Sequence, residues 1–314
     1  MRAVVYDAYG PAERLRLTDL PDPIPRRGEV VLHVRACGIN LSDWEFLTGS
    51  PAFARLGGLW RPRQRVLGSD IVGEVLATGP GVNELHIGQR VMADAVTRRG
   101  GFAERVRLPA VLCAPVPDGL SDTVAACLPQ PAAIAVQGMA GARAGLRVLI
   151  NGAGGGSGTL ALQLAKAAGA TVTVVDTADK IAWLKGQGAD AGVDYRQQDF
   201  TLMGQQWDLI LDMVATRNAA RIARALDPNG IYRAVGGRVR VIAPPALAGL
   251  FQRHRQIGVL AVKTGSAITG HSAALALVGE LRPQIDSVVP LDGVPQAMAR
   301  VGSGMAKGKI VVCP

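Results

Sequence analysis

The sequence predicts an α/β protein with a doubly wound parallel sheet covered by helices, joined to a second domain rich in β-strands. A glycine-rich turn, Gly152–Gly158, follows the short apolar run Val148–Ile150 and opens a segment with helical spacing. From residue 147 onward, apolar runs alternate with helical segments, a rhythm typical of parallel sheets. Before residue 118, frequent Gly and Pro separate short apolar runs, which favours a compact barrel-like domain.

The expected elements follow from these patterns in chain order. In the first third we expect strands at 30–36 and 71–77, a further strand after Gly88, and a helix at 122–127 with Ser121 as its N-cap. The alternating part predicts strands at 148–151, 171–175, 207–212, 230–235 and 256–262, with helices at 159–168, 180–187 and 218–226. A helix at 273–281 and strands at 285–290 and 309–312 are expected to return to the first domain.

Size and composition limit the class of protein. The chain has 314 residues, enough for two domains, and 48% of them are hydrophobic. No apolar run reaches the ~18 residues that a membrane helix needs. The N-terminus lacks the layout of a signal peptide, so we expect a cytoplasmic protein that does not associate with membranes. The four cysteines form no C-x-x-C pair, which predicts reduced thiols.

The formal net charge of +9 raises nucleic acid or an anionic ligand as partners. The basic residues are scattered, however, and the densest groups, at 61–65 and 253–255, are not interleaved with aromatic residues. We therefore expect a small-molecule substrate and no nucleic acid. Arg61, Arg63 and Arg65 are expected to face solvent, with contact to an anionic or carrier-bound substrate as the alternative.

The glycine-rich turn indicates a dinucleotide site. Glycines let the backbone approach a pyrophosphate, which the N–H groups and dipole of the following helix would hold. The best register is A-x-G-x-x-G, with alanine in the first glycine position. The candidate contacts are Ala153, Gly155, Gly156, Ser157 and Gly158. Asp176 ends the next strand 18 residues after Gly158 (176 − 158), close to where an acid binds the ribose hydroxyls.

Four further segments carry a family resemblance. Cys37–Trp44, Val66–Val75, Gly100–Val106 and Lys307–Val312 are similar, in order, to the segments G-I-N-x-x-D-W, L-G-x-D-x-x-G-x-V, G-G-F-A-E-Y-V and G-K-x-V-I. Over nearly its whole length the chain resembles the zinc-independent, quinone oxidoreductase-like and enoyl reductase branch of the medium-chain dehydrogenase/reductase superfamily. The resemblance implies a GroES-like β-barrel substrate domain at 1–118 and 263–314, a Rossmann NAD(P)-binding domain at 119–262, and a homodimer.

The resemblance also bears on zinc. Zinc alcohol dehydrogenases of the wider family have Cys where Asn40 stands and His where Ser69 stands. Neither Asn nor Ser is a good zinc ligand, so we expect no zinc. Oxidation of simple alcohols by Lewis-acid polarisation is then disfavoured, whereas conjugate reduction stays open.

The same comparison supplies candidate active-site residues. Asn40 is expected to bind a carbonyl oxygen or the nicotinamide ribose, or else to cap a turn. Asp43 is the second catalytic candidate, although capping the turn at 44–47 is the favoured interpretation. Glu45 is a candidate proton donor if an apolar cleft raises its pKa, and otherwise a solvated surface acid. Trp44 and Gln130 are candidate substrate contacts.

Near the nicotinamide the chain departs from its relatives. Ile134 stands where a Thr often meets the carboxamide, and Pro131 stands where Ala is usual. Gly236 and Gly237 resemble the V-G-G turn beneath the nicotinamide, and Lys309 in the closing segment is a further candidate cofactor contact. These departures put the orientation of the nicotinamide in question.

The choice between the two nicotinamide cofactors is balanced. Asp176 would bond ribose hydroxyls and repel a 2′-phosphate, which favours NAD(H). The family favours NADP(H), and Lys180 and Tyr195 match positions that serve the phosphate in some members. Lys180 could instead pair with Asp176 across one helical turn. We lean slightly to NADP(H).

The function expected is NAD(P)H-dependent, zinc-independent reduction of an activated C=C bond or a quinone by hydride transfer. One alternative is a non-redox cyclase or isomerase that uses the cofactor as a template, motivated by Pro131 and Ile134. Another is a non-catalytic binding protein on a reductase scaffold, which would bind its partner through the basic surface.

Overall fold

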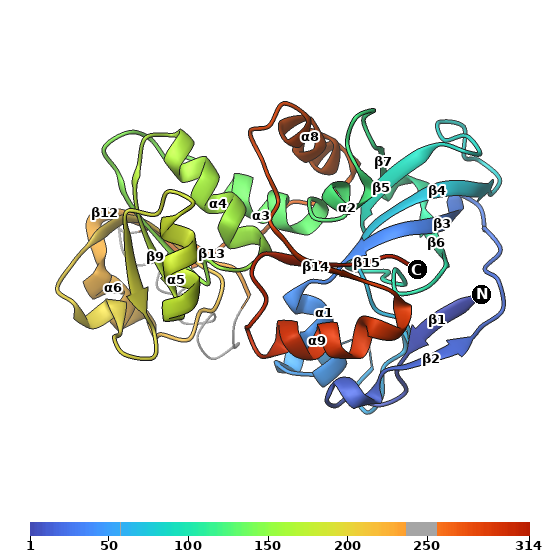
Figure 1. The fold of residues 1–314 in the computed structure, drawn as a ribbon, viewed down its shortest axis with the longest axis horizontal. Coiled ribbons are helices and arrows are strands. Elements are labelled where there is room, and N and C mark those ends of the chain that lie inside the picture. The colour runs from blue at the N-terminus through green and yellow to red at the C-terminus, as the bar shows by residue number, and fades with distance from the viewer. Residues whose placement is uncertain (57, 237–255) are drawn as a thin grey trace. The chain divides into compact units, whose positions relative to one another are not determined.

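The structure is a computed structural model that describes residues 1–56, 58–236 and 256–314, and the chain divides into two compact units. Unit 1 comprises Met1–Ala133 and Lys263–Pro314, and unit 2 comprises Ile134–Val262. The predicted fold class, a parallel α/β sheet with a second β-rich domain, is confirmed (Figure 1). Residues 119–133, which we assigned to the nucleotide domain, group with unit 1.

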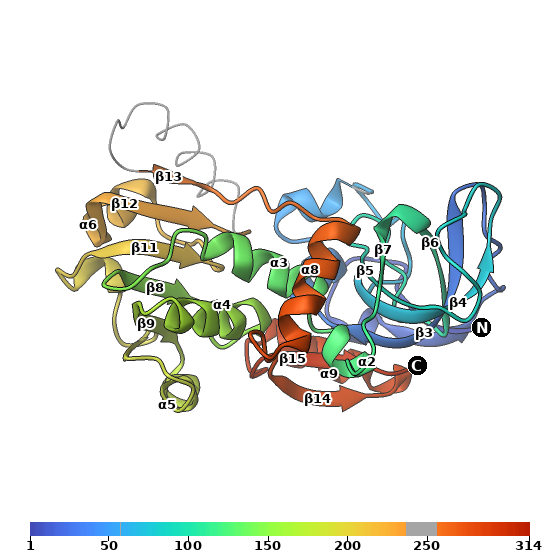
Figure 2. The same cartoon turned by 90° about the horizontal axis from the view of Figure 1, so that it is seen from above.

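Six parallel strands form the sheet of unit 2 in the order β10-β9-β8-β11-β12-β13. Figure 2 shows five of them, from β9 to β13, in this order. Their bounds are β8 (Arg147–Asn151), β9 (Thr171–Asp176), β10 (Ala191–Asp194), β11 (Trp207–Asp212), β12 (Leu226–Ala234) and β13 (Gln256–Val259). In chain order this is 3-2-1-4-5-6, typical of sheets that bind dinucleotides beyond the carboxyl ends of their strands. The order reverses between β8 and β11, which marks the expected ligand position.

Helix α3 (Pro129–Gly138) precedes β8. The helices α4 (Gly156–Ala167), α5 (Ala178–Lys185) and α6 (Ala219–Ala225) follow β8, β9 and β11, and a 3-10 turn at Phe200–Leu202 lies between β10 and β11. Helix α4 contacts β8 and β9, α5 contacts β9 and β10, and α6 contacts β12. Strand β8 is buried along Val148–Asn151, the continuous pattern of a strand covered on both faces. The rings of Phe200 and Trp207 meet edge to face in this core, 6.1 Å apart.

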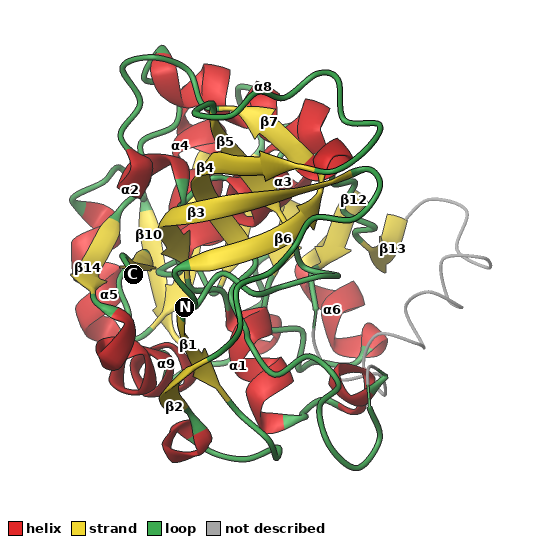
Figure 3. Ribbon diagram, turned by 90° about the vertical axis from the view of Figure 1, so that its right-hand side faces the viewer, coloured by secondary structure: helices red, strands yellow, loops and turns green. Residues whose placement is uncertain are grey.

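The sheet of unit 1 has the order β14-β15-β3-β4-β5-β7, and β6 also pairs with β3. Its strands are β3 (Glu29–Gly38), β4 (Asp70–Thr78), β5 (Arg90–Asp94), β6 (Arg105–Pro109), β7 (Cys113–Pro115), β14 (Ile285–Val289) and β15 (Lys309–Val312). Strands β1 (Arg2–Val5) and β2 (Arg16–Asp19) form a separate pair. Figure 3 shows β3 between β4 and β6. Because Val311 pairs with Gly38, the chain end returns to this unit as predicted.

The helices of unit 1 are α1 (Leu41–Thr48), α2 (Asp122–Ala125), α8 (Ser266–Leu277) and α9 (Val294–Gly302). Short 3-10 turns lie at Ala12–Arg14, Ala52–Arg55, Ala110–Leu112 and Leu291–Gly293. The prediction of a helix at 273–281 was wrong, because α8 begins seven residues earlier. Most residues of its first turns are Ala, Gly, Ser or Thr, and Ile268 is the one large apolar residue among them, so the hydrophobic periodicity is weak. It ends before Gly279, whose φ of 78° is left-handed.

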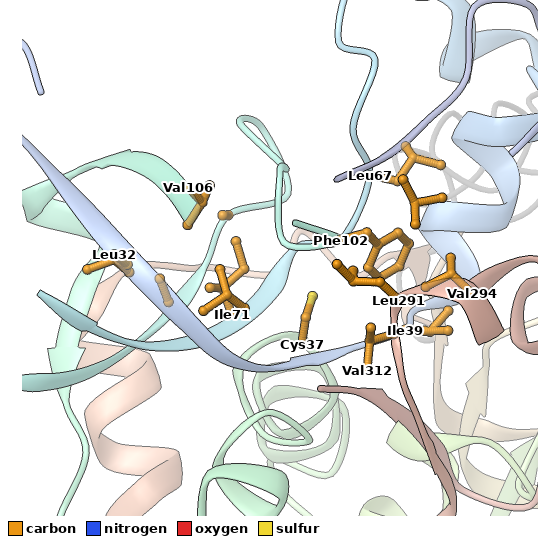
Figure 4. Packing of buried hydrophobic residues seen from close by; sticks show 14 of the residues in the cluster. Leu32, Cys37, Ile39, Leu67, Ile71, Phe102, Val106, Leu291, Val294 and Val312 are labelled. Atoms are coloured by element: carbon orange, nitrogen blue, oxygen red, sulfur yellow. The ribbon is translucent and has the colours of Figure 1, made fainter. Parts of the chain in front are cut away.

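The core of unit 1 surrounds Cys37, whose side chain lies among Ile71, Phe102 and Val312 (Figure 4). Burial raises the pKa of the Cys37 thiol well above its ordinary value. All four cysteines are free, and Cys37, Cys113 and Cys127 are buried. In the ranges that the structure describes, no helix has the length and apolar character needed to cross a membrane.

Candidate cofactor and active-site residues

The turn between β8 and α4 is shaped for close backbone approach. A Cβ on Gly158 would lie 2.5 Å from backbone atoms of Ala153, so only glycine lets α4 start this close to the turn. The Ala153 methyl is fully buried, which explains why alanine fits the first glycine position. A Cβ on Gly155 would meet no atom nearer than 3.7 Å. Gly155 is the N-cap of α4 and contributes no side-chain cap, which favours anion binding at the first N–H groups.

Asp176, at the end of β9, holds this turn in place. Its carboxylate accepts the backbone N–H groups of Gly154 at 2.8 Å and of Thr177 at 2.9 Å. The Lys180 ammonium lies 3.9 Å away, so the ion pair that the sequence left as an alternative is present. Both side chains are buried. The Asp176 charge is therefore offset within the protein rather than free to meet a ligand.

Tyr195 lies directly after β10, beside the end of β9. Its backbone N–H donates to the Asp176 carbonyl at 3.3 Å, while its ring is half exposed. The Arg196 guanidinium lies 5.9 Å from that ring. This edge of unit 2 thus combines an exposed aromatic hydroxyl with a positive charge next to Asp176.

A buried polar network lies where the strand order reverses, and the sequence analysis missed it. Asn151 ends β8 and donates its Nδ2 to Asp212, which ends β11, at 2.7 Å. Asp212 also accepts the Tyr232 hydroxyl at 2.9 Å and the N–H groups of Val214 and Ala215 at 3.0 and 2.7 Å. Burial, followed by the Asp212 charge, raises the Tyr232 pKa. The sequence did contain a signal for this network, because a polar residue, Asn151 or Asp212, directly follows the apolar run of each of these two strands.

The remaining cofactor candidates of unit 2 are placed as follows. Ile134 is half-buried on α3. Gly236 is exposed after β12, with a left-handed φ of 73°. Gly237 lies outside the described residues.

Unit 1 brings Asn40 and Lys309 together, although they are 269 residues apart in sequence. The Lys309 ammonium donates to Asn40 Oδ1 at 2.7 Å, to the Ile39 carbonyl at 2.8 Å and to Asp70 Oδ2 at 3.1 Å. Asn40 Nδ2 donates to Ser69 Oγ at 3.2 Å. Lys309 and Asp70 are both buried, so the hydrogen bond from this ion pair to Asn40 Oδ1 fixes the orientation of the Asn40 amide.

Asp70 also explains the unusual start of α3. Its Oδ1 accepts the Gln130 N–H at 3.0 Å. Pro129 and Pro131 have no N–H to satisfy, so Gln130 carries the one amide donor among these three residues, and Asp70 caps it. The Gln130 side chain accepts the Ser42 hydroxyl at 3.2 Å.

Asp43 is placed for capping. It is fully buried and accepts the N–H groups of Asn40 at 2.9 Å and Gly68 at 3.0 Å. Burial raises its pKa to about 6, although both backbone bonds lower it. Trp44 packs against α9, where a Cβ on Gly302 would lie 2.3 Å from the ring. These contacts give both residues structural roles.

Two further carboxyl groups have raised pKa values. Glu45 is half-buried, and burial raises its pKa to about 7. Asp94 lies opposite Asp70 in the β4–β5 pair and is 4% exposed. Burial, followed by the Asp70 charge, raises the Asp94 pKa to about 7. Asp94 Oδ1 accepts the Val96 N–H at 3.1 Å, but the buried Oδ2 has no hydrogen-bond partner in the described residues.

Comparison with known proteins extends over the whole chain. Residues 26–118 match the family model described as an alcohol dehydrogenase GroES-like domain, and residues 187–312 match that of a zinc-binding dehydrogenase. The chloroplast envelope quinone oxidoreductase homolog of Arabidopsis thaliana is 28% identical, and the match covers 100% of this chain and 98% of that protein.

Two solved structures are also similar. The quinone oxidoreductase from Coxiella burnetii superimposes with a TM-score of 0.88 at 28% identity, over 100% of this chain and 99% of that one. A mycobacterial protein solved in complex with NADPH superimposes with a TM-score of 0.84 at 25% identity, over 100% of both chains.

The description of the second family model implies zinc, but the donor groups do not fit it. At the family's ligand positions stand Asn40 and Ser69, and their side chains hydrogen-bond to each other. An amide and a hydroxyl are poor ligands for zinc compared with thiolate and imidazole. Within residues 1–56, 58–236 and 256–314, no group of three or more His, Cys, Asp or Glu is arranged to hold a metal ion.

Proposed function

Because the chain belongs to the quinone oxidoreductase-like branch of the medium-chain dehydrogenase/reductase superfamily, we propose that it reduces a conjugated carbonyl compound or a quinone with NAD(P)H. The observation that carries the proposal is the turn from Gly152 to Gly158 at the head of α4. It lies beyond the carboxyl end of β8, beside the point where the strand order reverses.

The turn is suited to a pyrophosphate. The missing Cβ atoms at Gly155 and Gly158 allow close approach, and α4 adds twelve residues of aligned dipole behind its N-terminus. Asp176 stabilises the turn because its carboxylate accepts a hydrogen bond from the Gly154 N–H. Bound NAD(P)H would supply the hydride.

The surroundings of Asp176 favour NADPH. A free carboxylate at this position would repel a 2′-phosphate, but Lys180 offsets its charge and two backbone N–H groups occupy its oxygens. Tyr195 and Arg196 offer a hydroxyl and a positive charge at the same edge. The similar mycobacterial protein was solved with NADPH, which agrees with this choice.

We propose that the Asn40 side chain donates a hydrogen bond to the carbonyl oxygen of the substrate. Its Oδ1 accepts from Lys309, and one of its two Nδ2 hydrogens is used by Ser69. The Asn40 side chain also hydrogen-bonds to the Asp70 carboxylate, so the amide would donate to a substrate oxygen in place of that bond, and the buried Lys309 charge polarises the amide toward the oxygen. As hydride reaches the β-carbon, negative charge develops on the carbonyl oxygen, where a fixed donor stabilises the transition state.

The proton needed to complete the reduction is assigned to Glu45. With a pKa of about 7, its carboxyl group is substantially protonated at neutral pH and able to donate. Asn40 and Glu45 lie on one element, at the N-cap and in the middle of α1. Since Asn40 and Ser69 are poor zinc ligands, this scheme involves no metal.

The test is oxidation of NADPH and NADH, followed at 340 nm, with a panel of quinones and α,β-unsaturated ketones, aldehydes and acids. We expect oxidation that depends on the added acceptor, with NADPH preferred. An Asn40→Leu variant should lose about 10²-fold or more in kcat, while a Ser303→Ala variant, altered at an exposed position after α9, should match the wild type. Tight cofactor binding without oxidation by any acceptor would contradict the proposal.

A further inference from the structure

Unit 1 contains a cavity of about 200 Å³ that the proposed chemistry does not use. Six of the residues that line it are polar or charged: Tyr6, Tyr9, Arg63, Gln64, Thr97 and Arg99. None of the lining residues is acidic, so the cavity carries positive charge. Its volume is below the 300–1,000 Å³ usual for drug-sized ligands, which points to a small molecule or a single functional group.

Arg99 supplies the central charge. Its guanidinium lies 3.5 Å from the centre of the Phe46 ring, and its Nε donates to the Val96 carbonyl at 3.2 Å. It forms no ion pair with any residue that the structure describes. Burial lowers the Arg99 pKa, while the Tyr6 hydroxyl, to which Arg99 also hydrogen-bonds, and the nearby Asp43 carboxylate raise it. Arginine stays protonated even so, and its remaining donors can hold an anion.

The backbone at Arg99 is strained. Its φ of 57° is left-handed, a conformation that non-glycine residues seldom adopt. Packing fixes the turn, because Gly101 lies so close to the core that a Cβ there would be 2.4 Å from Cys37 Sγ. Glycine or asparagine would fit position 99 with less strain. Strained backbone conformations cluster at ligand sites. The presence of an arginine at a position where glycine or asparagine would be less strained therefore suggests that its side chain has a function.

Gln64 supplies a second, independent sign of a ligand. Its Nε2 donates to the Thr97 carbonyl at 3.1 Å, which fixes the orientation of the amide. Its Oε1 is buried and has no hydrogen-bond partner among the described residues. An unpaired buried acceptor is costly, so this oxygen needs a donor such as a hydroxyl group or a water held beside a bound anion.

Arg99 connects the cavity to the helix that carries the proposed active-site residues. Phe46, beneath Arg99, is on α1, whose N-cap is Asn40. The Tyr6 hydroxyl reaches the Phe46 carbonyl at 3.4 Å. Six residues of helix span about 9 Å, so a molecule with a carboxylate at Arg99 and a carbonyl at Asn40 would be short.

We propose that the Arg99 cavity binds the carboxylate of a small conjugated keto acid, which is reduced at its C=C bond. The proposal rests on the reductase function above and names its substrate class. Arg63 is exposed and adds a second positive charge at the cavity.

The test compares trans-4-oxo-2-pentenoate with its methyl ester, in which an added methyl group removes the negative charge of the carboxylate. In the wild type we expect the acid to have the higher kcat/KM. Arg99→Gln should lower kcat/KM for the acid about 10- to 100-fold and leave the ester within about threefold. Arg98→Gln, at the exposed neighbouring position, is the control and should change neither. If Arg99→Gln does not fold, Arg99→Asn replaces it, since Asn tolerates a left-handed φ.

A binding measurement separates this inference from the proposed function. The saturated acid 4-oxopentanoate cannot be reduced at a C=C bond, and its Kd by calorimetry should rise at least tenfold in Arg99→Gln. The inference would be overturned by any of three results. These are equal activity losses of Arg99→Gln for acid and ester, a wild-type kcat/KM that is higher for the ester, or a Kd for 4-oxopentanoate that is the same in Arg99→Gln as in the wild type. Binding that depends on Arg99, with no NAD(P)H oxidation by these two compounds or by any acceptor of the panel above, would sustain the carboxylate site and overturn the reductase function.

Discussion

Replacing Asp94 by Asn is expected to stabilise the protein in mild alkali. Asp94 is 4% exposed, lies opposite Asp70 and has one oxygen without a partner among the described residues. Burial and the Asp70 charge raise its pKa to about 7 from the ordinary value of 3.8. The folded state therefore holds this proton more tightly than the unfolded chain. Its stabilising contribution is full below about pH 4 and is lost as pH rises through about 7.

The size of the effect follows from the shift. The difference of 3.2 pKa units (7 − 3.8), at about 1.36 kcal/mol each, sets an upper limit of about 4 kcal/mol for the loss above pH 8. Asparagine has nearly the same shape and carries no charge at any pH. Asp94→Asn should therefore recover most of this free energy at pH 8 and only about 1 kcal/mol at pH 4.5.

The assay is urea unfolding followed by circular dichroism at pH 4.5 and pH 8. The control is Asp190→Asn, which removes a carboxylate whose pKa the Lys166 ammonium lowers. That control should bring no gain at pH 8. If Asp94→Asn is no more stable than the wild type at pH 8, or gains equally at both pH values, the account of the Asp94–Asp70 pair is refuted.

Four other outcomes are expected. Gly158→Ala should weaken NADPH binding at least tenfold in a fluorescence titration and lower the Tm, because its Cβ would lie 2.5 Å from the Ala153 backbone. Gly155→Ala should leave the Tm unchanged, since its Cβ would meet no atom nearer than 3.7 Å, yet weaken NADPH binding. Asp176→Ser should leave the NADPH/NADH ratio of kcat/KM within about twofold of the wild type, because Lys180 and two backbone N–H groups already offset the carboxylate; a severalfold rise would mean that Asp176 still repels the 2′-phosphate. The wild-type kcat should fall as pH rises through about 7, and Glu45→Gln should abolish that step; persistence of the step would assign it elsewhere. Lys309→Met should cost about 3–5 kcal/mol in urea unfolding, because Asp70 would stay buried without its cation; a loss below 1 kcal/mol would contradict the buried pair.

Local patterns in the sequence were sufficient for the sheet of unit 2. Continuous apolar runs and the glycine-rich turn marked β8, β9, β11 and α4 within a few residues of their observed bounds. These signals are strong because a strand buried on both faces and a turn with close backbone contacts tolerate few residue types. Helix α8 was misplaced because small residues such as Ala and Gly carry little periodicity.

The side-chain networks could not be predicted, because they depend on contacts between distant parts of the chain. Lys309, a candidate cofactor contact, donates hydrogen bonds to Asn40 and Asp70, an arrangement that follows from the pairing of β15 with β3. The strain at Arg99 and the unpaired oxygen of Gln64 likewise follow from how loops pack, which no local pattern records.

The most direct test of the proposed reductase function traces the hydride. The enzyme is incubated with NADPH deuterated at C4 of the nicotinamide, on the face that is transferred, and with an enone or quinone acceptor. The product is then analysed by NMR and mass spectrometry. We predict one deuterium per reduced enone, at the β-carbon, and one oxidised cofactor per product. Product that forms without deuterium and without oxidised cofactor would contradict hydride transfer and identify the chain as a non-redox enzyme on a reductase fold.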